Sequence, residues 1–320
     1  MAEFTEIPVL DLAPLTNGGD KTQLAIDFAN AYGNTGFGYI INHGVDPKLR
    51  KSIFAASKQF HTLSEAQKQA IALDKNHRGY IAINTSTDVN SDLADVTKPN
   101  QSASFMMMRE DEFARSDVYL SGPNQWPALK GFQDVCEAYA EAMTGLANKL
   151  MRLALDAIDV REQGILEAFD TPTIWLRLLH YPPQPPQAAE DLYGSAPHKD
   201  FGCLTLLAQD DVGGLQVQTP AGKWVDVPPR EDAFILNVGD MLQRLTNNLL
   251  KSTTHRVVNP PREQWHMPRL SIPFFLHPKS NMDLTCLDKC VTEKSPVAYE
   301  PITAGEYLDE RLKEIGLKKF

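Results

Sequence analysis

The fold is decided by seven short runs of β-forming residues: TIWLRLLHYP (173–182), GCLTLLAQD (202–210), GLQVQT (214–219), KWVDV (223–227), AFILNVG (233–239), THRVVN (254–259) and RLSIPFFLH (269–277). Pro-Pro, Gly-Gly or Asn turns separate these runs. Closely spaced short strands are typical of an antiparallel sandwich or jelly roll, and not of alternating βαβ units. We therefore expect an antiparallel jelly-roll core in the second half of the chain.

The rest of the chain predicts a mixture of helices and strands around that core. Apolar residues recur every three or four positions over 127–158, which predicts one amphipathic helix of ~45 Å that could brace a whole sheet. Shorter elements are expected as a strand at 4–12, a helix at 20–34, a β run at 35–44, a helix opened by Asp46-Pro47, a helix at 64–73 and a C-terminal helix at about 303–317 with a Thr303/Glu306 capping box. The expected division is an N-terminal region, 1–120, and a region 121–320 that holds the long helix, the core and the last helix.

Composition excludes several classes of protein. The 320 residues carry a formal net charge of −10, which argues against a nucleic-acid binder or a binder of anionic membranes, since both need a basic face. Four cysteines are too few for a disulfide framework in so long a chain, and we expect free thiols. Neither a signal peptide nor a membrane span is apparent, so we expect a cytoplasmic protein.

The sharpest local motif is His198-Lys199-Asp200, which precedes the run GCLTLLAQD. In an extended chain residues i and i+2 point to the same side, so the histidine and the carboxylate can reach one metal ion while Lys199 points away. By itself the motif is weak evidence for a metal site, because a solvent-exposed turn could contain the same residues. A second histidine, His255, begins the run THRVVN 57 residues later. Two histidines and one carboxylate make the facial triad that leaves adjacent positions open on Fe(II).

A third element, Arg269-Leu270-Ser271, places a guanidinium and a hydroxyl on one side of a strand. Such a pair is suited to clamping a carboxylate. An arginine directed into a β-core needs an anion there, because a buried unpaired guanidinium is costly. An arginine at a strand end, paired with a surface carboxylate, is the simpler alternative at this stage.

Together these motifs carry a family resemblance. The run from Ala196 to Pro278, GFGYIINHGV (36–45) and LRLLHYPPQP (176–185) resemble the 2-oxoglutarate- and Fe(II)-dependent dioxygenases of the isopenicillin N synthase-like group. The resemblance implies a double-stranded β-helix (jelly-roll) core over 172–278.

The resemblance also assigns roles to single residues. It implies that His198, Asp200 and His255 bind iron. Arg269 and Ser271 would hold the distal carboxylate of 2-oxoglutarate, and Tyr181 would contact it as well. Plant members usually carry Asn two residues before this tyrosine, where this chain has Leu179.

The implied reaction converts 2-oxoglutarate and dioxygen into succinate and carbon dioxide. A ferryl species then abstracts hydrogen from a carbon of a small organic molecule, giving hydroxylation, desaturation or cyclisation. We expect ascorbate to serve as a reductant. We expect neither a nucleic acid nor a membrane as a partner, and we expect the protein to be a monomer or a weak homo-oligomer. Secondary metabolism is the expected setting.

The substrate-lining residues are expected from strand alternation to include Phe201, Leu215 and Phe275. Of Met106, Met107 and Met108, only alternate ones can face inward. Loops around 80–108 and the helix at 303–317 are candidate lids. His43 is interpreted as structural, and His180, His266 and His277 lack a partner at useful spacing.

Three alternatives remain. An oxidase of the same fold would use iron and dioxygen without 2-oxoglutarate and would hold a different carboxylate on the Arg-x-Ser pair, although Tyr181 favours 2-oxoglutarate. A non-catalytic binding protein would be marked by loss of a ligand, and all three ligands are present. A zinc hydrolase is disfavoured because no general-base Glu accompanies the ligands at a helical spacing.

Overall fold

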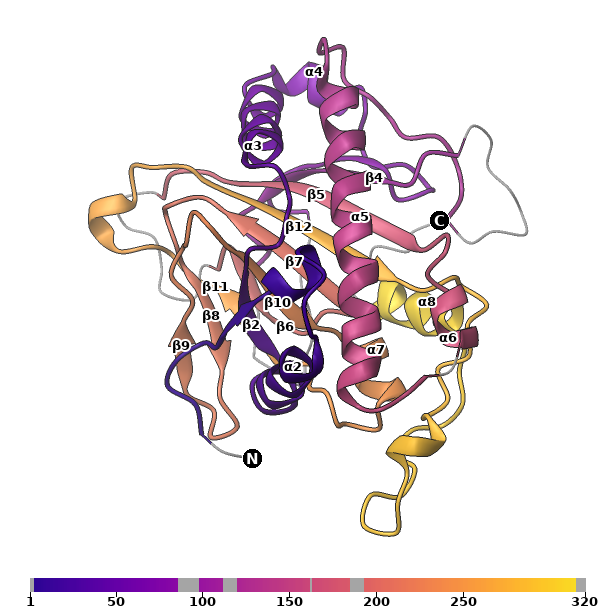
Figure 1. Ribbon diagram of the computed structural model, residues 1–320. Coiled ribbons are helices and arrows are strands. Elements are labelled where there is room, and N and C mark those ends of the chain that lie inside the picture. Colours follow the sequence, from indigo (N-terminus) through magenta and orange to yellow (C-terminus); the bar gives the residue numbers. More distant parts are fainter. Residues whose placement is uncertain (1–2, 86–97, 112–119, 162, 185–192, 315–320) are drawn as a thin grey trace.

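A computed structural model describes residues 3–85, 98–111, 120–161, 163–184 and 193–314 (Figure 1). Its main feature is an eight-stranded sheet in the order β1-β2-β10-β7-β12-β5-β4-β3. Only β1 and β2 pair in parallel, and the other neighbours are antiparallel. The strands of this sheet are β1 (Val9–Asp11), β2 (Phe37–Ile41), β3 (Gly79–Ile81), β4 (Ala103–Met108), β5 (Thr173–Tyr181), β7 (Leu204–Gln209), β10 (Phe234–Val238) and β12 (Arg269–His277).

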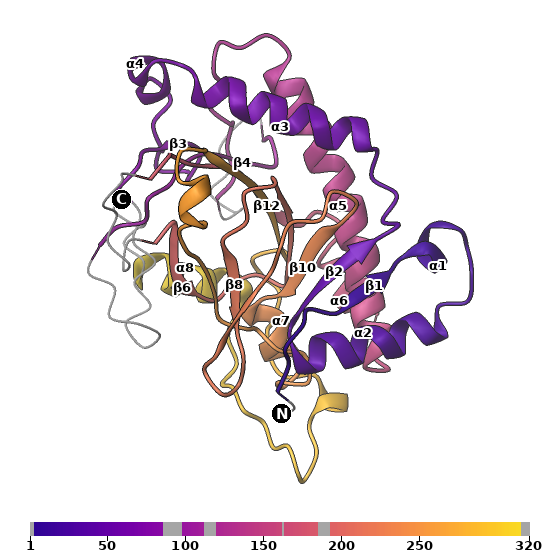
Figure 2. The same ribbon diagram turned by 90° about the vertical axis from the view of Figure 1, so that its left-hand side faces the viewer.

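A second, four-stranded sheet in the order β6-β11-β8-β9 lies beside the first and is antiparallel throughout (Figure 2). Its strands are β6 (Ser195–His198), β8 (Leu215–Gln218), β9 (Trp224–Asp226) and β11 (His255–Val257). One cavity is lined by residues from both sheets, so it lies between them. Two sheets of mainly antiparallel strands that enclose a cavity are what the expected jelly-roll core requires.

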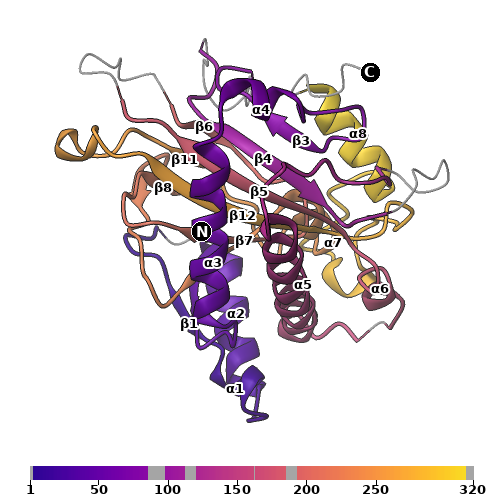
Figure 3. The same cartoon turned by 90° about the horizontal axis from the view of Figure 1, so that it is seen from above.

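Helices cover the face of the large sheet that is turned away from the cavity. The longest, α5 (Phe132–Ala157), contacts β7 and β12 and packs against α2 (Thr22–Asn34) and α3 (Pro47–His61), as Figure 3 shows. The remaining helical elements are short or peripheral: α1 (Ala13–Thr16), α4 (Glu65–Gln69), α6 (Gln163–Glu167), α7 (Asp240–Leu245), η1 (Arg262–Gln264), η2 (Asp288–Cys290) and α8 (Ala304–Glu314).

Alternation along β5 shows how the sequence fixes the two faces of the large sheet. Trp175, Arg177, Leu179 and Tyr181 all line the cavity. The intervening Leu176 and Leu178 belong to the main hydrophobic core under the helices. Successive side chains of a strand point to opposite faces, so a one-residue slip of β5 would exchange the two sets. The pattern therefore fixes which residues can form a site.

Most expected elements are present, with shifted ends. The long helix begins at Phe132, because Gly131 has a φ of 74° and the residues before it form a turn. The strand expected at 4–12 is confined to β1. The capping box of α8 is confirmed, since the Thr303 hydroxyl accepts from the Glu306 backbone N–H at 3.3 Å and the Glu306 carboxylate accepts from the Thr303 backbone N–H at 3.0 Å. Residues 315–317 of the expected last helix lie outside the described residues.

The N-terminal region contributes strands to the same large sheet as the core. β1 and β2 extend one end of the sheet, and β3 and β4 extend the other. A division of the chain at residue 120 stays a prediction. All four cysteines are free, as expected, and all four are buried. In the part of the chain that is described, no helix combines the length and the apolar run needed to cross a membrane.

Candidate metal centre and its cavity

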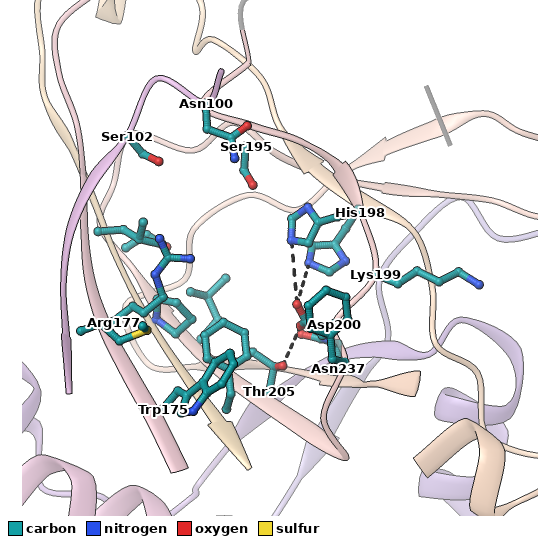
Figure 4. Close-up of a pocket in the computed structure, with 18 of the residues that line it drawn as sticks. Asn100, Ser102, Trp175, Arg177, Ser195, His198, Lys199, Asp200, Thr205 and Asn237 are labelled. Carbon is teal, nitrogen blue, oxygen red and sulfur yellow. Dashed lines mark hydrogen bonds and ion pairs between the residues drawn. The ribbon is translucent and has the colours of Figure 1, made fainter. Parts of the chain in front are cut away.

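The small sheet brings the two predicted histidine ligands together. β6 and β11 pair with His255 directly opposite His198, and the two ring centroids are 4.2 Å apart. Asp200 follows β6 by two residues, and its Oδ1 lies 3.8 Å from His198 Nε2 and 3.7 Å from His255 Nε2 (Figure 4). One potential ligand atom from each residue lies within 4.8 Å of the others. Lys199 points away from this cluster, as its place between two ligands predicted (Figure 4).

Backbone carbonyls fix the orientation of both imidazoles. His198 Nδ1 lies 2.7 Å from the Ala196 carbonyl oxygen, and His255 Nδ1 lies 3.1 Å from that of Thr253. A carbonyl can only accept, so each Nδ1 donates to it, and Nε2 is the nitrogen of each ring that can bind a metal. This is the arrangement in which protein histidines bind metals.

The carboxylate of Asp200 is held in a similar way. Thr205 Oγ1 and Asn237 Nδ2 both donate to Oδ2, at 2.6 and 2.7 Å, which leaves Oδ1 facing the imidazoles. Burial works to raise the pKa of Asp200, but the two imidazoles and these two hydrogen bonds outweigh it, so the pKa stays below its usual value. Sequence reasoning missed Thr205 and Asn237, although a buried Asn inside the apolar run AFILNVG was a usable signal.

The donor set fits ferrous iron. Two imidazole nitrogens and one carboxylate oxygen lie within 4.8 Å of one another, and all three residues line the cavity. Iron held by three ligands on one face keeps positions for a chelating co-substrate and dioxygen. The residues predicted from the H-x-D motif and the distant histidine therefore form one site.

Arg269 is buried at the start of β12, with 3% of its surface exposed. Its Nη2 donates to Gln209 Oε1 at 3.2 Å, while Nε and Nη1 have no hydrogen-bond partner among the described residues. Its guanidinium carbon lies 4.7 Å from the centre of the Tyr181 ring, which is its partner in the strand register. Two buried donors of a cation call for an anion, because leaving them unpaired is costly. An acidic co-substrate satisfies this requirement.

Close packing holds Tyr181 beside this guanidinium. A Cβ at Gly194 would lie 2.8 Å from Tyr181 Cδ1, a contact too short for real side chains. Only glycine lets the backbone before β6 approach the ring so closely. Ser271, two residues beyond Arg269 on the same face, lines the cavity and stands opposite Leu179 in the register.

The three residues expected from alternation, Phe201, Leu215 and Phe275, all line the cavity. Met106 lines it too, whereas Met107 and Met108 both belong to the hydrophobic core, so one of the three methionines faces the cavity. Of the two candidate lids, the loop around 80–108 lies partly outside the described residues, and α8 places Leu312 in the cavity wall.

The remaining histidines are outside the metal cluster. His43 accepts a hydrogen bond from the Val45 backbone N–H at 3.1 Å, which fits a structural role. His180 stacks on His61 with ring centroids 4.9 Å apart. His277 lies in the cavity wall, where burial lowers its pKa to about 4 and the ring is neutral. Its position beside the site did not follow from its spacing in the sequence.

Comparison with known proteins agrees with this geometry. Residues 173–278 match the model of the 2OG-Fe(II) oxygenase superfamily, and residues 7–129 match that of the N-terminal region of non-haem dioxygenases in morphine synthesis. The 2-oxoglutarate-Fe(II) type oxidoreductase hxnY of Emericella nidulans is 32% identical over 327 residues, covering 97% of this chain and 90% of the relative.

Solved structures agree as well. A full-length Neurospora crassa protein in complex with alpha-KG and thymine superposes with a TM-score of 0.85 at 30% identity, covering 96% of each chain. A 2OG-Fe(II) oxygenase family protein from Caulobacter crescentus gives a TM-score of 0.85 at 30% identity, covering 98% of this chain and 100% of that one. With its His-Asp-His cluster in place, the chain belongs to the 2OG-Fe(II) oxygenase superfamily and is a 2-oxoglutarate-dependent oxidoreductase that uses ferrous iron.

Proposed function

We propose that the protein couples decarboxylation of 2-oxoglutarate to succinate with oxidation of a small organic molecule by hydroxylation, desaturation or cyclisation. The observation that carries the proposal is a cavity lined by the three metal ligands and by Tyr181, whose ring lies 4.7 Å from the buried Arg269 guanidinium; two donors of that guanidinium have no hydrogen-bond partner among the described residues. Bound ferrous iron supplies the activation of dioxygen and the oxidative decarboxylation.

Arg269, Ser271 and Tyr181 hold the far carboxylate of 2-oxoglutarate in this proposal. Nε and Nη1 of Arg269 are buried and have no hydrogen-bond partner among the described residues, whereas Nη2 donates to Gln209, so two donor atoms are available for an anion. Charge-assisted hydrogen bonds of this kind are short and about twice as strong as neutral ones. The hydroxyls of Ser271 and Tyr181 add hydrogen bonds from the same face of the sheet. The co-substrate is thereby oriented with its oxo-acid end toward Asp200.

The remaining walls exclude water and shape the space for the second substrate. Phe201, Leu215 and Phe275 offer apolar surface, and Leu312 of α8 adds to it. A helix that contributes a wall residue is suited to closing the cavity once substrate is bound. Its anchor is the Tyr307 hydroxyl, which donates to Asp240 Oδ2 at 3.1 Å. The Neurospora crassa structure with alpha-KG and thymine supports a small molecule as the oxidised partner.

The test is succinate formation from 2-oxoglutarate by the purified protein with Fe(II) and ascorbate. We expect a substrate-free rate that disappears on dialysis against a chelator and returns with Fe(II), and that is absent in His198→Ala and Asp200→Ala. Circular dichroism checks that both variants keep the fold. Succinate formation that survives chelation or either substitution would remove the ligand assignment.

The same assay separates the alternatives. An oxidase that needs no 2-oxoglutarate would consume dioxygen with Fe(II) and a reductant while forming no succinate. A non-catalytic binding protein would do neither. We expect succinate and carbon dioxide in equal amounts, which either alternative forbids.

A further inference from the structure

His277, the last residue of β12, places a buried imidazole in the wall of the cavity. Only 2% of the residue is exposed, and neither Nδ1 nor Nε2 has a hydrogen-bond partner in the described part of the chain. The metal site and the proposed 2-oxoglutarate site use other residues. An unpaired buried polar group costs free energy, and native structures keep few of them. The imidazole therefore requires an explanation of its own.

Trp175 of β5 carries another unpaired group beside this imidazole. The centroids of the two rings are 5.0 Å apart. Trp175 is 8% exposed, and its Nε1 also lacks a hydrogen-bond partner among the residues described. The indole lies at the end of the cavity away from Asn100 and Ser102 (Figure 4). Three unpaired nitrogens therefore lie on two neighbouring rings at one end of the cavity.

Packing and strand register place these rings close to the carboxylate ligand of the metal site. A Cβ at Gly202 would lie 3.0 Å from both Cε1 and Nδ1 of His277, so the backbone of Gly202 lies directly against the imidazole. Gly202 follows Asp200 by two residues. Trp175 and Thr205 lie in one row of the large sheet, on either side of β12, and the Thr205 hydroxyl binds Asp200. A small molecule that contacts both rings is therefore close to the metal site.

The hydrogen-bonding capacity of the two rings defines the group that they can recognise. Burial keeps the imidazole neutral, so His277 offers one N–H donor and one acceptor, and the indole of Trp175 offers a second donor. A carboxylate has no donor for the imidazole acceptor, and an ammonium group has no acceptor for the two N–H groups. An amide or a lactam has both, because its carbonyl oxygen accepts and its N–H donates. It is also uncharged, so its burial costs less than that of an ion.

We propose that His277 and Trp175 form the subsite that selects the oxidised substrate, and that this substrate is a compact neutral molecule with an amide or lactam group. The inference rests on the function proposed above and names its substrate class. The amide group forms hydrogen bonds with both rings, which orients a neighbouring carbon toward the metal site. Neither residue forms or breaks a covalent bond, so both act in recognition and orientation.

The experiment measures binding by isothermal titration calorimetry, under nitrogen, with protein that is loaded with Fe(II) and 2-oxoglutarate. The neutral probes are benzamide and 2-piperidone, and the charged probes are benzoate and benzylamine. We expect at least one neutral probe to bind at least tenfold more tightly than either charged probe. His277→Leu removes two hydrogen bonds and should weaken that neutral probe roughly 10- to 100-fold, whereas Trp175→Phe removes one and should weaken it roughly 3- to 10-fold. His277→Gln keeps a donor and an acceptor and should lose less than His277→Leu.

A second measurement separates recognition from a structural role. Both nitrogens of His277 are unpaired in the fold, so an apolar side chain of similar volume removes no hydrogen bond from it. The urea midpoint of the Fe(II)-loaded protein, measured without probe, should therefore be at least as high in His277→Leu as in the wild type. A lower midpoint would show that the imidazole serves the fold, and would overturn the inference.

The matched controls are His266→Leu and Trp224→Phe, which make the same changes at an exposed histidine and at a tryptophan outside the cavity. Both should bind the neutral probe as the wild type does. The inference is also overturned if no neutral probe binds, if a charged probe binds as tightly, or if either His277→Leu or Trp175→Phe binds as the wild type does. Wild-type protein that forms no succinate from 2-oxoglutarate would instead refute the proposed function, and the two failures are therefore distinguishable.

Discussion

Replacing Arg269 by Met tests the co-substrate site most directly. The substitution removes the two donors, Nε and Nη1, that have no hydrogen-bond partner among the described residues, and keeps most of the side-chain volume. A hydrogen bond to a charged group is worth roughly 1.5–3 kcal/mol, so two of them are worth roughly 3–6 kcal/mol. We take the lower end of this range, because binding also costs the desolvation of the carboxylate. About 3 kcal/mol corresponds to a loss of 2-oxoglutarate affinity of roughly 100- to 200-fold.

The assay is succinate formation against 2-oxoglutarate concentration, with anaerobic 2-oxoglutarate binding to the Fe(II) protein measured beside it. Ser271→Ala, which removes one hydroxyl, should cost about 1 kcal/mol, or roughly fivefold. Arg269→Lys keeps the charge without the planar fork and should fall between the wild type and Arg269→Met. Arg152→Met, which removes an exposed arginine from α5 and makes the same change in net charge, serves as the control. A change of less than about threefold in Arg269→Met, with the fold intact, would refute the assignment of this guanidinium to 2-oxoglutarate.

Three further outcomes follow from the packing around the site and in the core. The double substitution Thr205→Val and Asn237→Leu removes the two hydrogen bonds to the Asp200 carboxylate and should weaken Fe(II) binding roughly 10- to 100-fold. A titration of activity with Fe(II) measures this affinity, and an unchanged value would contradict the role given to the two hydrogen bonds. Gly194→Ala places a Cβ 2.8 Å from the Tyr181 ring and should lower the free energy of unfolding by about 1–3 kcal/mol. It should also raise the KM for 2-oxoglutarate. A wild-type free energy of unfolding and a wild-type KM would show that the ring moves freely. Burial lowers the pKa of His61 from 6.5 to about 3 in the folded protein. The unfolded chain therefore binds the proton first as pH falls below 6.5, and the free energy of unfolding should drop by about 2 kcal/mol between pH 7 and pH 5 on account of this group. Urea denaturation at both pH values should show a smaller drop in His61→Gln, and an equal drop would exclude His61 as its source.

Part of the metal site could be predicted because two of its three ligands are close together in the sequence. His198 and Asp200 are two residues apart on an extended segment, which already places both on one side. His255 needed the family resemblance, since nothing in its own run indicates that β11 pairs with β6 and sets it opposite His198. Pairing between strands 57 residues apart is a property of the whole fold and not of either segment.

The supporting residues could not be predicted in the same way. Gln209 and Asn237 are polar residues in apolar strands, and only the folded sheet shows that one binds Arg269 and the other Asp200. Arg177 was quoted within a motif, but its direction across the cavity depends on the register of β4 and β5. The sequence predicted the start of the long helix at residue 127, but α5 begins at Phe132. Hydrophobic periodicity does not show that Gly131 adopts a left-handed conformation, which sets the start of the helix.

The two histidines lie on strands of only four and three residues, and those strands meet across a gap of 57 positions in the chain. An ion that binds both histidines is bound by the folded chain and released when the chain unfolds. It therefore stabilises the fold by mass action, by about 2.7 kcal/mol when free Fe(II) is at 100 times its Kd. Bound ferrous iron would thus stabilise the fold as well as supply the chemistry. In a cell short of iron the small sheet would open more often to proteases, and the abundance of the protein would follow the iron supply.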